Sequence, residues 1–492
     1  MHPGRPLLPR STPSAEGVSA RALTALLDRL DAESVECHSL MVVRHGSVVA
    51  EGWWAPYTAE RPHLLYSLTK SFTAVAVGLA VADGLLSVDD RVVDLLPESV
   101  PADAPPDVLA QGRRLTVHHL LSMTTGHRTD SLDEAWRREP TDLTKGFLRV
   151  PFTAPEGTVH GYDNATTYVL ARIVERVTGR GLPELLDERL FAPMGIDHAE
   201  WDRVGSGASF GFHGLHLTTE AVAAFGELLR RGGRWGERQL VPSGWVEAAT
   251  TAQVPTTQVE GWSVNPDTWC GYGYQFWMSQ HGYRGEGSFG QHCLVVPARG
   301  LVIAVTAALS GGGETLLGPL WECLLPGLDD PDPDPAADAA LADRLRRLGL
   351  APVTGTAGGG EAVTARVDVS VEGFALPDGT LVTVEPDRRD DAGGHGWLLR
   401  LGAGLDVAVG HEGWRESAPL GRPLVARGAW QGRTFVADVY VVTTPHRVRV
   451  EVDPGSGPEA GRAVATWNLV PLTGPDLALH ATAPLMTRPD VA

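Results

Sequence analysis

Near the start of the chain, the apolar positions follow two different periods. Residues 17–34 carry apolar side chains at helical spacing and predict a first helix. Residues 39–52 contain two apolar runs around a His-Gly turn, which is the pattern of two strands in a hairpin. Residues 67–86 are apolar almost all round, and a helix without a polar face belongs in the middle of a core. We expect that helix to end at Asp83-Gly84, because glycine commonly stops a helix.

Further along, helical and extended patterns alternate. Residues 168–178 predict an amphipathic helix closed by Gly179, and residues 217–231 predict another. Residues 294–296 and 301–305 are apolar runs joined by a Pro-Ala-Arg-Gly turn, which indicates two neighbouring strands. Strands therefore come early and late, with helices between them. This order predicts an α+β fold in which both ends of the domain build one sheet.

The composition of the chain changes at residues 328–335. Asp and Pro alternate there. Such a segment has too few apolar side chains to pack into a core and is typical of an extended linker. A short helix is predicted over 336–348, and the region after it is rich in Val, Thr and Gly with alternating patterns, as in 435–442. We expect a disordered N-terminus (residues 1–16), a main domain (17–328), a linker with a short helix (329–351) and a small all-β domain (352–492).

Charge and cysteine usage narrow the function classes. The formal charge of −19 argues against nucleic acid or an anionic membrane as a partner, because both select basic surfaces. The N-terminus lacks the apolar segment of a signal peptide and no transmembrane run follows, so a cytoplasmic location is expected. The four cysteines are scattered and indicate neither a disulfide framework nor a zinc site.

The candidate chemistry starts from lysine, which occurs only twice, at positions 70 and 145. Lys70 follows Ser67 by three residues, so one helix face would carry both side chains, whereas Lys145 has no hydroxyl three residues before it. Arginine cannot be deprotonated in proteins, but a buried lysine can lose its proton and act as a base. We therefore expect a nucleophilic Ser67 activated by a neutral Lys70.

A second segment offers a phenol and an amide to the same reaction. Tyr162 and Asn164 stand on a loop that leads into a helix. The phenol can exchange a proton with the serine or the leaving group, and the amide can orient Lys70 and hold a substrate carbonyl. The structural alternative is an ordinary helix start capped by Asn164, beside a packed tyrosine.

A third segment, residues 283–291, comes directly before a predicted strand. Its small residues Gly285 and Gly287 would let a substrate lie against the strand edge. The backbone N–H groups of Ser288 and Ser67 would then form an oxyanion hole, which usually provides a large part of acyl-transfer catalysis. The alternative is a glycine-rich hairpin turn without a catalytic role.

In this order and spacing, the three segments resemble the serine β-lactamase/DD-peptidase superfamily, specifically the class C β-lactamase-like serine hydrolases. The resemblance covers roughly residues 20–325 and includes further stretches at 120–126, 190–196 and 271–277. It implies an antiparallel sheet flanked by helices, with an all-helical part beside it. It also implies distinct roles in the reaction for the nucleophile Ser67, the general-base pair Lys70 and Tyr162, and the positioning residue Asn164.

The third segment departs from the family pattern at its first position. Members with β-lactam or peptidase activity place Lys or His there, where it meets the carboxylate of the substrate, whereas this chain has Gly285. Arg284 or His292 could replace that cation, and Glu286 would repel an anionic substrate. The departure favours a neutral ester or amide over penicillin or peptidoglycan.

Two other motifs carry little weight. Residues 207–211 match Gly-x-Ser-x-Gly, but that nucleophile elbow needs a strand before it and a helix after it, and this context lacks both. His213 and His216 are three residues apart without a third ligand at a suitable spacing, so no metal is expected.

The sequence thus predicts a cofactor-free serine hydrolase that works through an acyl-enzyme, with a small-molecule ester or amide as its substrate. Esterase activity is favoured; β-lactamase and D-amino-acid peptidase or amidase activity are the enzymatic alternatives. The non-enzyme alternative is a catalytically silent sensor or scaffold on the same fold. The β-domain is expected to shape the rim of the pocket or to form a homo-oligomer contact.

Overall fold

The central sheet joins strands from both ends of the first domain. The computed structural model describes residues 6–256, 266–311, 313–330, 332–358, 361–369, 373–387, 395–402, 404–455 and 461–483. Within them, an antiparallel sheet has the order β2-β1-β11-β10-β9-β8. Its strands are β1 (Cys37–Arg44), β2 (Ser47–Trp53), β8 (Trp277–Ser279), β9 (Gly282–Gly287), β10 (Gln291–Val296) and β11 (Leu301–Ala307). Because β1 pairs with β11, the predicted sheet is confirmed.

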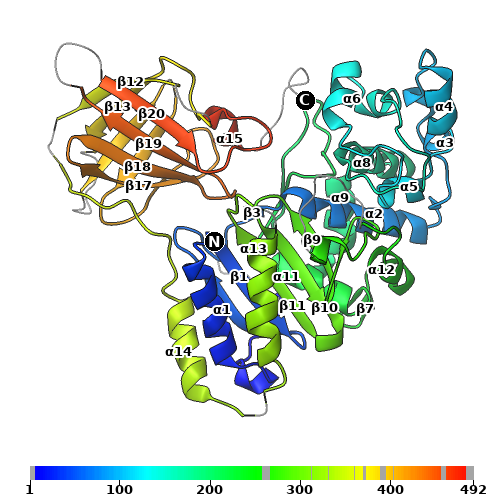
Figure 1. Cartoon of the computed structure of the whole chain (residues 1–492), viewed down its shortest axis with the longest axis horizontal. Helices are drawn as coiled ribbons and strands as arrows, with labels where there is room; N and C mark the ends of the chain where they lie inside the picture. Colours follow the sequence, from blue (N-terminus) through cyan, green and yellow to red (C-terminus); the bar gives the residue numbers. More distant parts are fainter. Residues whose placement is uncertain are drawn as a thin grey trace.

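Helices cover both faces of this sheet (Figure 1). Successive side chains of a strand point to opposite faces, so Met41 and Val43 join one core cluster while Leu40 and Val42 join the other. One face packs against α2 (Thr69–Ala82) and α11 (Thr219–Arg230). The opposite face packs against α1 (Ala20–Ala32), α13 (Glu314–Pro319) and α14 (Pro335–Leu345).

A helical region stands beside the sheet (Figure 1). Its helices include α3 (Val92–Leu95), α4 (Pro106–Gly112), α5 (Val117–Leu121), α6 (Leu132–Arg138), α7 (Leu143–Phe147), α8 (Asn164–Thr178) and α9 (Leu182–Leu186). The predicted amphipathic helix is α8, which begins four residues before the predicted start and ends at Gly179 in the left-handed conformation. The cap of α8 is Asp163, whose side chain accepts from the backbone of Ala165, so the alternative in which Asn164 caps this helix is wrong.

The predicted buried helix begins with a short turn. Residues Tyr66–Leu68 form the 3₁₀ turn η2, and α2 follows it directly. The helix ends at Ala82, and Gly84 after it has a φ of 72°, as the glycine stop predicted. Ser67 therefore lies at the N-terminal entrance of a helix buried on all sides.

The expectation of a disordered N-terminus is corrected. The N-terminal stretch predicted to be disordered is ordered over residues 6–16, while residues 1–5 lie outside the described residues. The backbone N–H of Ser11 donates to the Val48 carbonyl at 2.9 Å, and Leu8 is only 4% exposed. The stretch is ordered because it pairs with the edge strand β2 and buries a leucine, which a proline-rich sequence does not reveal.

The helix after the linker also belongs to the first domain. It is α14, capped by Asp334 and slightly shorter than the predicted 336–348. Leu341 and Leu345 on this helix pack into the same core cluster as α1. The prediction separated it from that domain because its few apolar positions give no sign of the surface that they cover.

The C-terminal part is all β, as predicted, and forms one sheet of order β15-β14-β13-β12-β20-β19-β18-β17-β16 over its described residues. Its strands are β12 (Val363–Val367), β13 (Leu381–Pro386), β14 (Gly396–Leu401), β15 (Asp406–Gly410), β16 (Arg415–Ser417), β17 (Leu424–Gln431), β18 (Thr434–Val441), β19 (Arg447–Asp453) and β20 (Gly461–Trp467). An additional pairing of β15 with β17 closes the sheet into a barrel around its own apolar core. Residues 484–492 of the predicted domain lie outside the described residues.

Candidate active site

The first two predicted segments meet at one lysine. Ser67 comes from η2, Lys70 from the first turn of α2, and Asn164 is the first residue of α8. The Lys70 Nζ atom lies 2.9 Å from Ser67 Oγ and 2.6 Å from Asn164 Oδ1, and 3.2 Å from the backbone carbonyl oxygen of Phe212. The Tyr162 hydroxyl hydrogen-bonds with Ser67, and its ring centre lies 4.8 Å from Nζ.

These contacts fix where the lone pair of a neutral Lys70 would point. The Phe212 carbonyl can only accept a hydrogen bond, and so can the amide oxygen of Asn164. A neutral amine has two N–H groups, and these two acceptors use both of them. The remaining position around Nζ faces Ser67 Oγ, so the lone pair of a neutral Lys70 would be directed at the Ser67 hydroxyl.

The environment of Lys70 sets its protonation. The side chain is 1% exposed, and burial lowers the pKa of Lys70 to about 7, although the carboxylates of Asp130 and Asp163 act to raise it. A substantial share of Lys70 is therefore uncharged near neutral pH. That is the state in which a lysine can accept a proton from serine.

Tyr162 behaves differently from Lys70. Burial raises the pKa of Tyr162, and its hydrogen bond with Ser67 offsets only part of this increase. The ring stacks on Trp277 with centroids 5.7 Å apart and planes at 13°. Tyr162 is therefore a neutral phenol at neutral pH, able to donate a proton or pass one on but not to act as a standing phenolate base.

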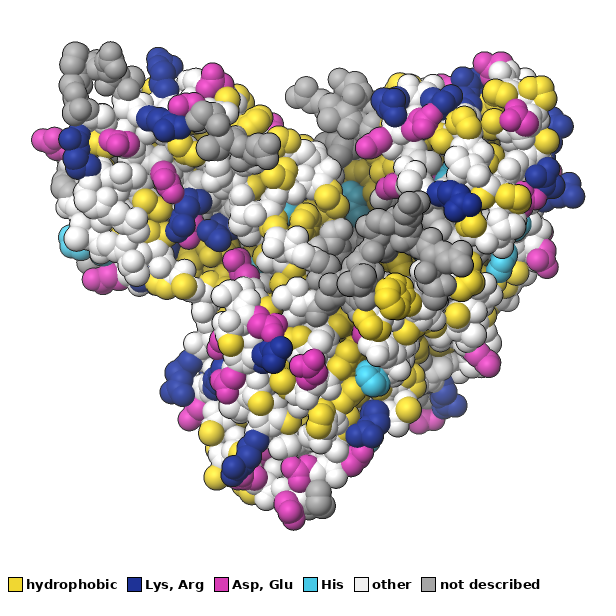
Figure 2. Space-filling model, viewed as in Figure 1, with side chains coloured by type: hydrophobic (Ala, Val, Ile, Leu, Met, Phe, Trp, Pro, Cys, Tyr) yellow, Lys and Arg dark blue, Asp and Glu magenta, His cyan; other side chains and the backbone are white. Residues whose placement is uncertain are grey.

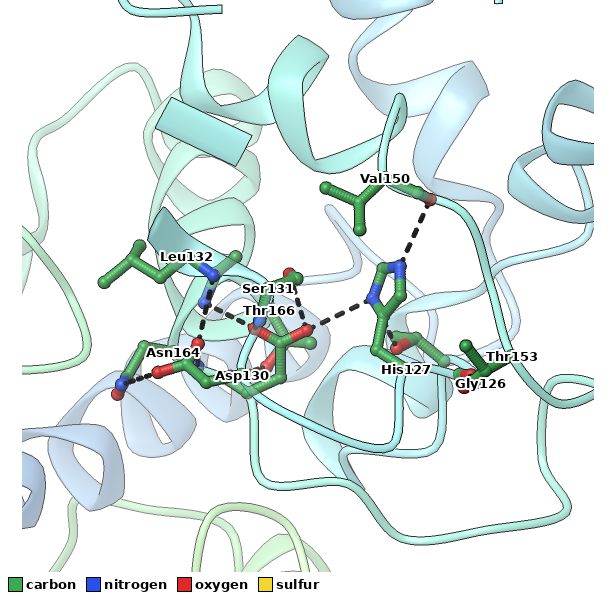
Figure 3. Close-up of polar contacts among 12 residues, drawn as sticks. Gly126, His127, Asp130, Ser131, Leu132, Val150, Thr153, Asn164 and Thr166 are labelled. Atoms are coloured by element: carbon green, nitrogen blue, oxygen red, sulfur yellow. Dashed lines mark hydrogen bonds and ion pairs between the residues drawn. The ribbon is translucent and has the colours of Figure 1, made fainter. Parts of the chain in front are cut away.

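Asp130 is a site residue that the sequence reasoning missed. Its carboxylate accepts from the Asn164 backbone N–H at 3.0 Å and from the Asn164 side-chain amide at 2.5 Å, as Figure 3 shows. Because the amide nitrogen faces Asp130, the amide oxygen must face Lys70. Burial of the carboxylate and the neighbouring charge of Asp163 raise the pKa of Asp130 to about 6. No local motif could have revealed it, since it lies 34 residues before Asn164.

A buried network holds the loop that carries Asp130. Asp163 is fully buried, and its carboxylate accepts from the backbone and the hydroxyl of Ser131 at 3.2 and 2.8 Å. His127 Nδ1 lies 3.2 Å from the same carboxylate, and its Nε2 lies 3.3 Å from the Val150 carbonyl oxygen (Figure 3). The loop before α6 is thus tied to the N-terminus of α8, which places Asp130 beside Asn164.

The third predicted segment is a strand followed by a turn. Gly285 and Gly287 belong to β9, which lies against the turn that carries the serine. A Cβ atom on Gly285 would lie 2.2 Å from Leu68 Cδ1, and one on Gly287 would lie 2.0 Å from the Leu65 carbonyl oxygen. At Gly287 only glycine allows this close approach, because the atom that a Cβ would meet belongs to the backbone. Ser288 follows in the turn between β9 and β10, and its carbonyl accepts from the Gln291 side chain at 3.2 Å.

Neither residue considered as a substitute cation is available for that purpose. Arg284 is 1% exposed and donates to Glu286 at 2.6 Å, to the Ser279 hydroxyl at 2.7 Å and to the Met278 carbonyl at 2.9 Å. Burial lowers the pKa of His292 to about 4, so this ring is uncharged at neutral pH. The ion pair with Arg284 also reduces the repulsion of anions that Glu286 was expected to exert.

The remaining candidate motifs have structural surroundings. Ser209 is 2% exposed and pairs with Arg203 in an isolated bridge, not in a strand-to-helix elbow. His216 contacts Asp202 and a backbone carbonyl, while His213 packs against Phe210. No group of three or more His, Cys, Asp and Glu side chains in the described ranges could hold a metal ion. Within the same ranges, no helix combines the length and the apolar character that crossing a membrane requires.

Similar sequences carry hydrolase and penicillin-binding names. Penicillin-binding protein 4 of Amycolatopsis lactamdurans is 29% identical over 334 residues, which cover 58% of this chain and 84% of that protein. The 6-aminohexanoate-dimer hydrolase of Paenarthrobacter ureafaciens is 26% identical over 250 residues, covering 48% and 64%. Lovastatin esterase of Penicillium rubens is 30% identical over 160 residues, covering 28% and 39%. The chain thus spans less than two thirds of the latter two relatives.

Solved structures share the fold at low sequence identity. A provisionally named 6-aminohexanoate-dimer hydrolase from Bacillus anthracis aligns with a TM-score of 0.51 and 21% identity, over 60% of this chain and 79% of that one. EstCE1, a hydrolase with promiscuous acyltransferase activity, aligns with a TM-score of 0.50 and 18% identity, over 61% and 96%. A sequence model of the family described as Beta-lactamase matches residues 23–318, more than half of the 492 residues. The chain therefore belongs to the beta-lactamase family and is a serine hydrolase.

Proposed function

We propose that this protein is an esterase-like hydrolase that forms an acyl-enzyme on Ser67. Ser67 Oγ attacks the ester carbonyl carbon while its proton moves to Lys70 Nζ. The backbone N–H groups of Ser67 and Ser288 hold the oxyanion until the C–O bond to the alcohol breaks. Tyr162 or Lys70 protonates the departing alcohol. Water then attacks the acyl group with the same residues in reversed roles, which returns the proton to Ser67 and releases the acid.

The observation that carries this proposal is the arrangement around Lys70 Nζ. Two fixed acceptors, Asn164 and Phe212, take its N–H groups, so a neutral amine presents its lone pair to Ser67. A pKa of about 7 makes that neutral form available at the pH of most cells. The raised pKa of Tyr162 supports a division of work in which Lys70 is the base and Tyr162 relays a proton.

The surroundings of β9 support a substrate without a carboxylate. Gly285 stands where related β-lactam and peptide hydrolases carry a cation, Arg284 is held by Glu286, and His292 is uncharged. An anionic acyl group would therefore lack a charged partner there. The name of one relative refers to an esterase, which fits a neutral ester substrate. A cytoplasmic location and a homo-oligomeric contact stay predictions.

The test follows p-nitrophenyl butyrate hydrolysis by the wild type and by Ser67→Ala, with time resolution that captures a pre-steady-state burst. We expect a burst and steady turnover in the wild type and loss of both in the variant. The intact mass of the quenched protein should rise by one butyryl group only when Ser67 is present. Nitrocefin turnover without ester turnover would instead favour the β-lactamase alternative, and turnover that survives in Ser67→Ala would refute the nucleophile.

A further inference from the structure

The turn between β18 and β19 projects from the β-barrel and packs against the first domain, the hydrolase domain that carries Ser67. Turns usually lie at the surface, yet Val442, Thr443, Thr444 and His446 are between 1% and 3% exposed. The Thr443 carbonyl accepts from the backbone N–H of Leu64 at 2.7 Å, only three residues before the nucleophile. In Figure 1 the barrel stands at one end of the central sheet, opposite the helical region, and Figure 2 shows a notch between these two parts.

A buried ion pair links the barrel to the hydrolase domain beside this turn. Arg422 of the barrel donates to Asp202 of the hydrolase domain at 2.8 Å, and both side chains are 3% exposed. His216 Nε2 lies 3.0 Å from the second Asp202 oxygen, and its Nδ1 lies 3.2 Å from the Thr443 carbonyl oxygen. Breaking such a contact would leave charges buried without partners, so the barrel is held in a defined orientation and its turn is not free to withdraw.

In the same turn, His446 contacts Tyr66, the residue before the proposed nucleophile Ser67. His446 Nδ1 lies 2.8 Å from the Leu469 carbonyl oxygen, which can only accept, so Nδ1 carries the proton. Nε2 is therefore an acceptor, and the Tyr66 hydroxyl donates to it at 2.5 Å. The same hydroxyl hydrogen-bonds with the backbone of Leu472, which also belongs to the C-terminal part. The polar end of Tyr66 is thus bound entirely by the C-terminal part.

The backbone of Tyr66 needs such support. Its φ of 48° lies in the left-handed region, which is unfavourable for a bulky side chain and persists only where the surroundings fix it. The ring packs edge-on against Phe289 and His446, with centroids 5.2 and 5.8 Å away. Any relaxation of this φ would rotate the next residue, Ser67, relative to Lys70 Nζ, which is only 2.9 Å from Ser67 Oγ.

We propose that His446 of the β-barrel is a positioning residue for the nucleophile: it holds Tyr66 in its left-handed conformation and thereby directs Ser67 Oγ at Lys70. The inference rests on the proposed acyl-enzyme function of Ser67. It assigns the C-terminal barrel a part in catalysis beyond shaping the pocket rim, because the alignment of the serine depends on a side chain from that barrel.

The test combines His446→Phe, Tyr66→Phe and the double variant. Two rates are measured, namely the butyrate burst and the labelling of Ser67 by a fluorophosphonate, which needs a reactive serine but no substrate specificity. Each single variant should slow both rates roughly tenfold while KM changes by less than about twofold, the size expected for one lost buried hydrogen bond. The double variant should be no slower than Tyr66→Phe, because that single change already removes the hydrogen bond between Tyr66 and His446.

Two further variants separate positioning from folding. His446→Gln keeps an acceptor at a similar reach and should restore most of the labelling rate. His411→Phe removes a histidine whose described contacts lie within the barrel, and it should label at the wild-type rate. Wild-type labelling rates in His446→Phe and Tyr66→Phe, or independent losses that multiply in the double variant, would overturn the inference. A wild-type protein that is not labelled at all would overturn the proposed function itself, and this inference with it.

Discussion

Replacing Asp130 by asparagine would test how the site orients its lysine. The carboxylate holds both the backbone N–H and the side-chain amide of Asn164, at 3.0 and 2.5 Å. An asparagine side chain has one acceptor oxygen, and its own NH₂ group would face an N–H group of Asn164. The amide of Asn164 would then lose the partner that keeps its oxygen on Lys70, and the lone pair of Lys70 would no longer be directed at Ser67.

Two effects of this change have opposite signs and can be separated by pH. A hydrogen bond to a charged group contributes about 1.5–3 kcal/mol, so the plateau of kcat/KM should fall roughly ten- to hundredfold. The Asp130 charge also raises the pKa of Lys70. Removing that charge lowers the pKa of Lys70 below about 7, and because the base must be neutral, the acid limb of the profile should move to lower pH.

The assay is kcat/KM for p-nitrophenyl butyrate from about pH 5 to pH 9, which reports the pKa values of the free enzyme. Asp133→Asn is the matched control: it removes the same charge from an exposed position of α6 near Asp130 and should leave both plateau and midpoint unchanged. An Asp130→Asn plateau equal to that of the wild type would refute the orienting role. A midpoint that moves to higher pH would refute the electrostatic reasoning.

Three other changes should give distinct results. Arg422→Ala leaves Asp202 buried with less compensation and should lower the free energy of unfolding in urea by about 3–5 kcal/mol, whereas Arg21→Ala, which breaks an exposed ion pair, should leave the midpoint unchanged. Gly287→Ala forces a Cβ to within 2.0 Å of a backbone oxygen beside the serine and should abolish the burst, while an alanine at Gly244, where nothing lies within 4 Å, should not. Lys70→Arg should be inactive because arginine cannot give up its proton, and methylamine should partly restore Lys70→Ala but not Lys70→Arg.

The sequence predicts most of the local structure around the nucleophile. The helix after Ser67 and the strands at 294–305 follow from unbroken apolar runs, because elements that are buried on all sides carry no polar face. The end of that helix follows from Gly84, since glycine commonly stops a helix. The Ser67–Lys70 contact follows from helical spacing, since three residues place both side chains on one face.

The parts that could not be predicted depend on tertiary contacts. In the sequence, Asp130 resembles any other acidic residue of a loop, and only the fold brings it next to Asn164. Phe212 contributes its backbone carbonyl, a group that every residue has. Residues 6–16 are ordered by pairing with β2, a contact that leaves no periodic signal in so short a stretch. His446 is separated from Tyr66 by 380 residues, so no sequence pattern joins them.

That separation has a consequence for the order in which the enzyme is made. The ribosome releases Ser67 and Lys70 early, but β1 must wait for its partner β11, and Tyr66 must wait longer for His446. Contacts between distant segments form late and slow the folding of a domain. A nascent chain would therefore carry its reactive residues for most of its synthesis without the contacts that align them. Hydrolytic activity of ribosome-bound chains should accordingly stay below that of the released protein until the last strands have emerged.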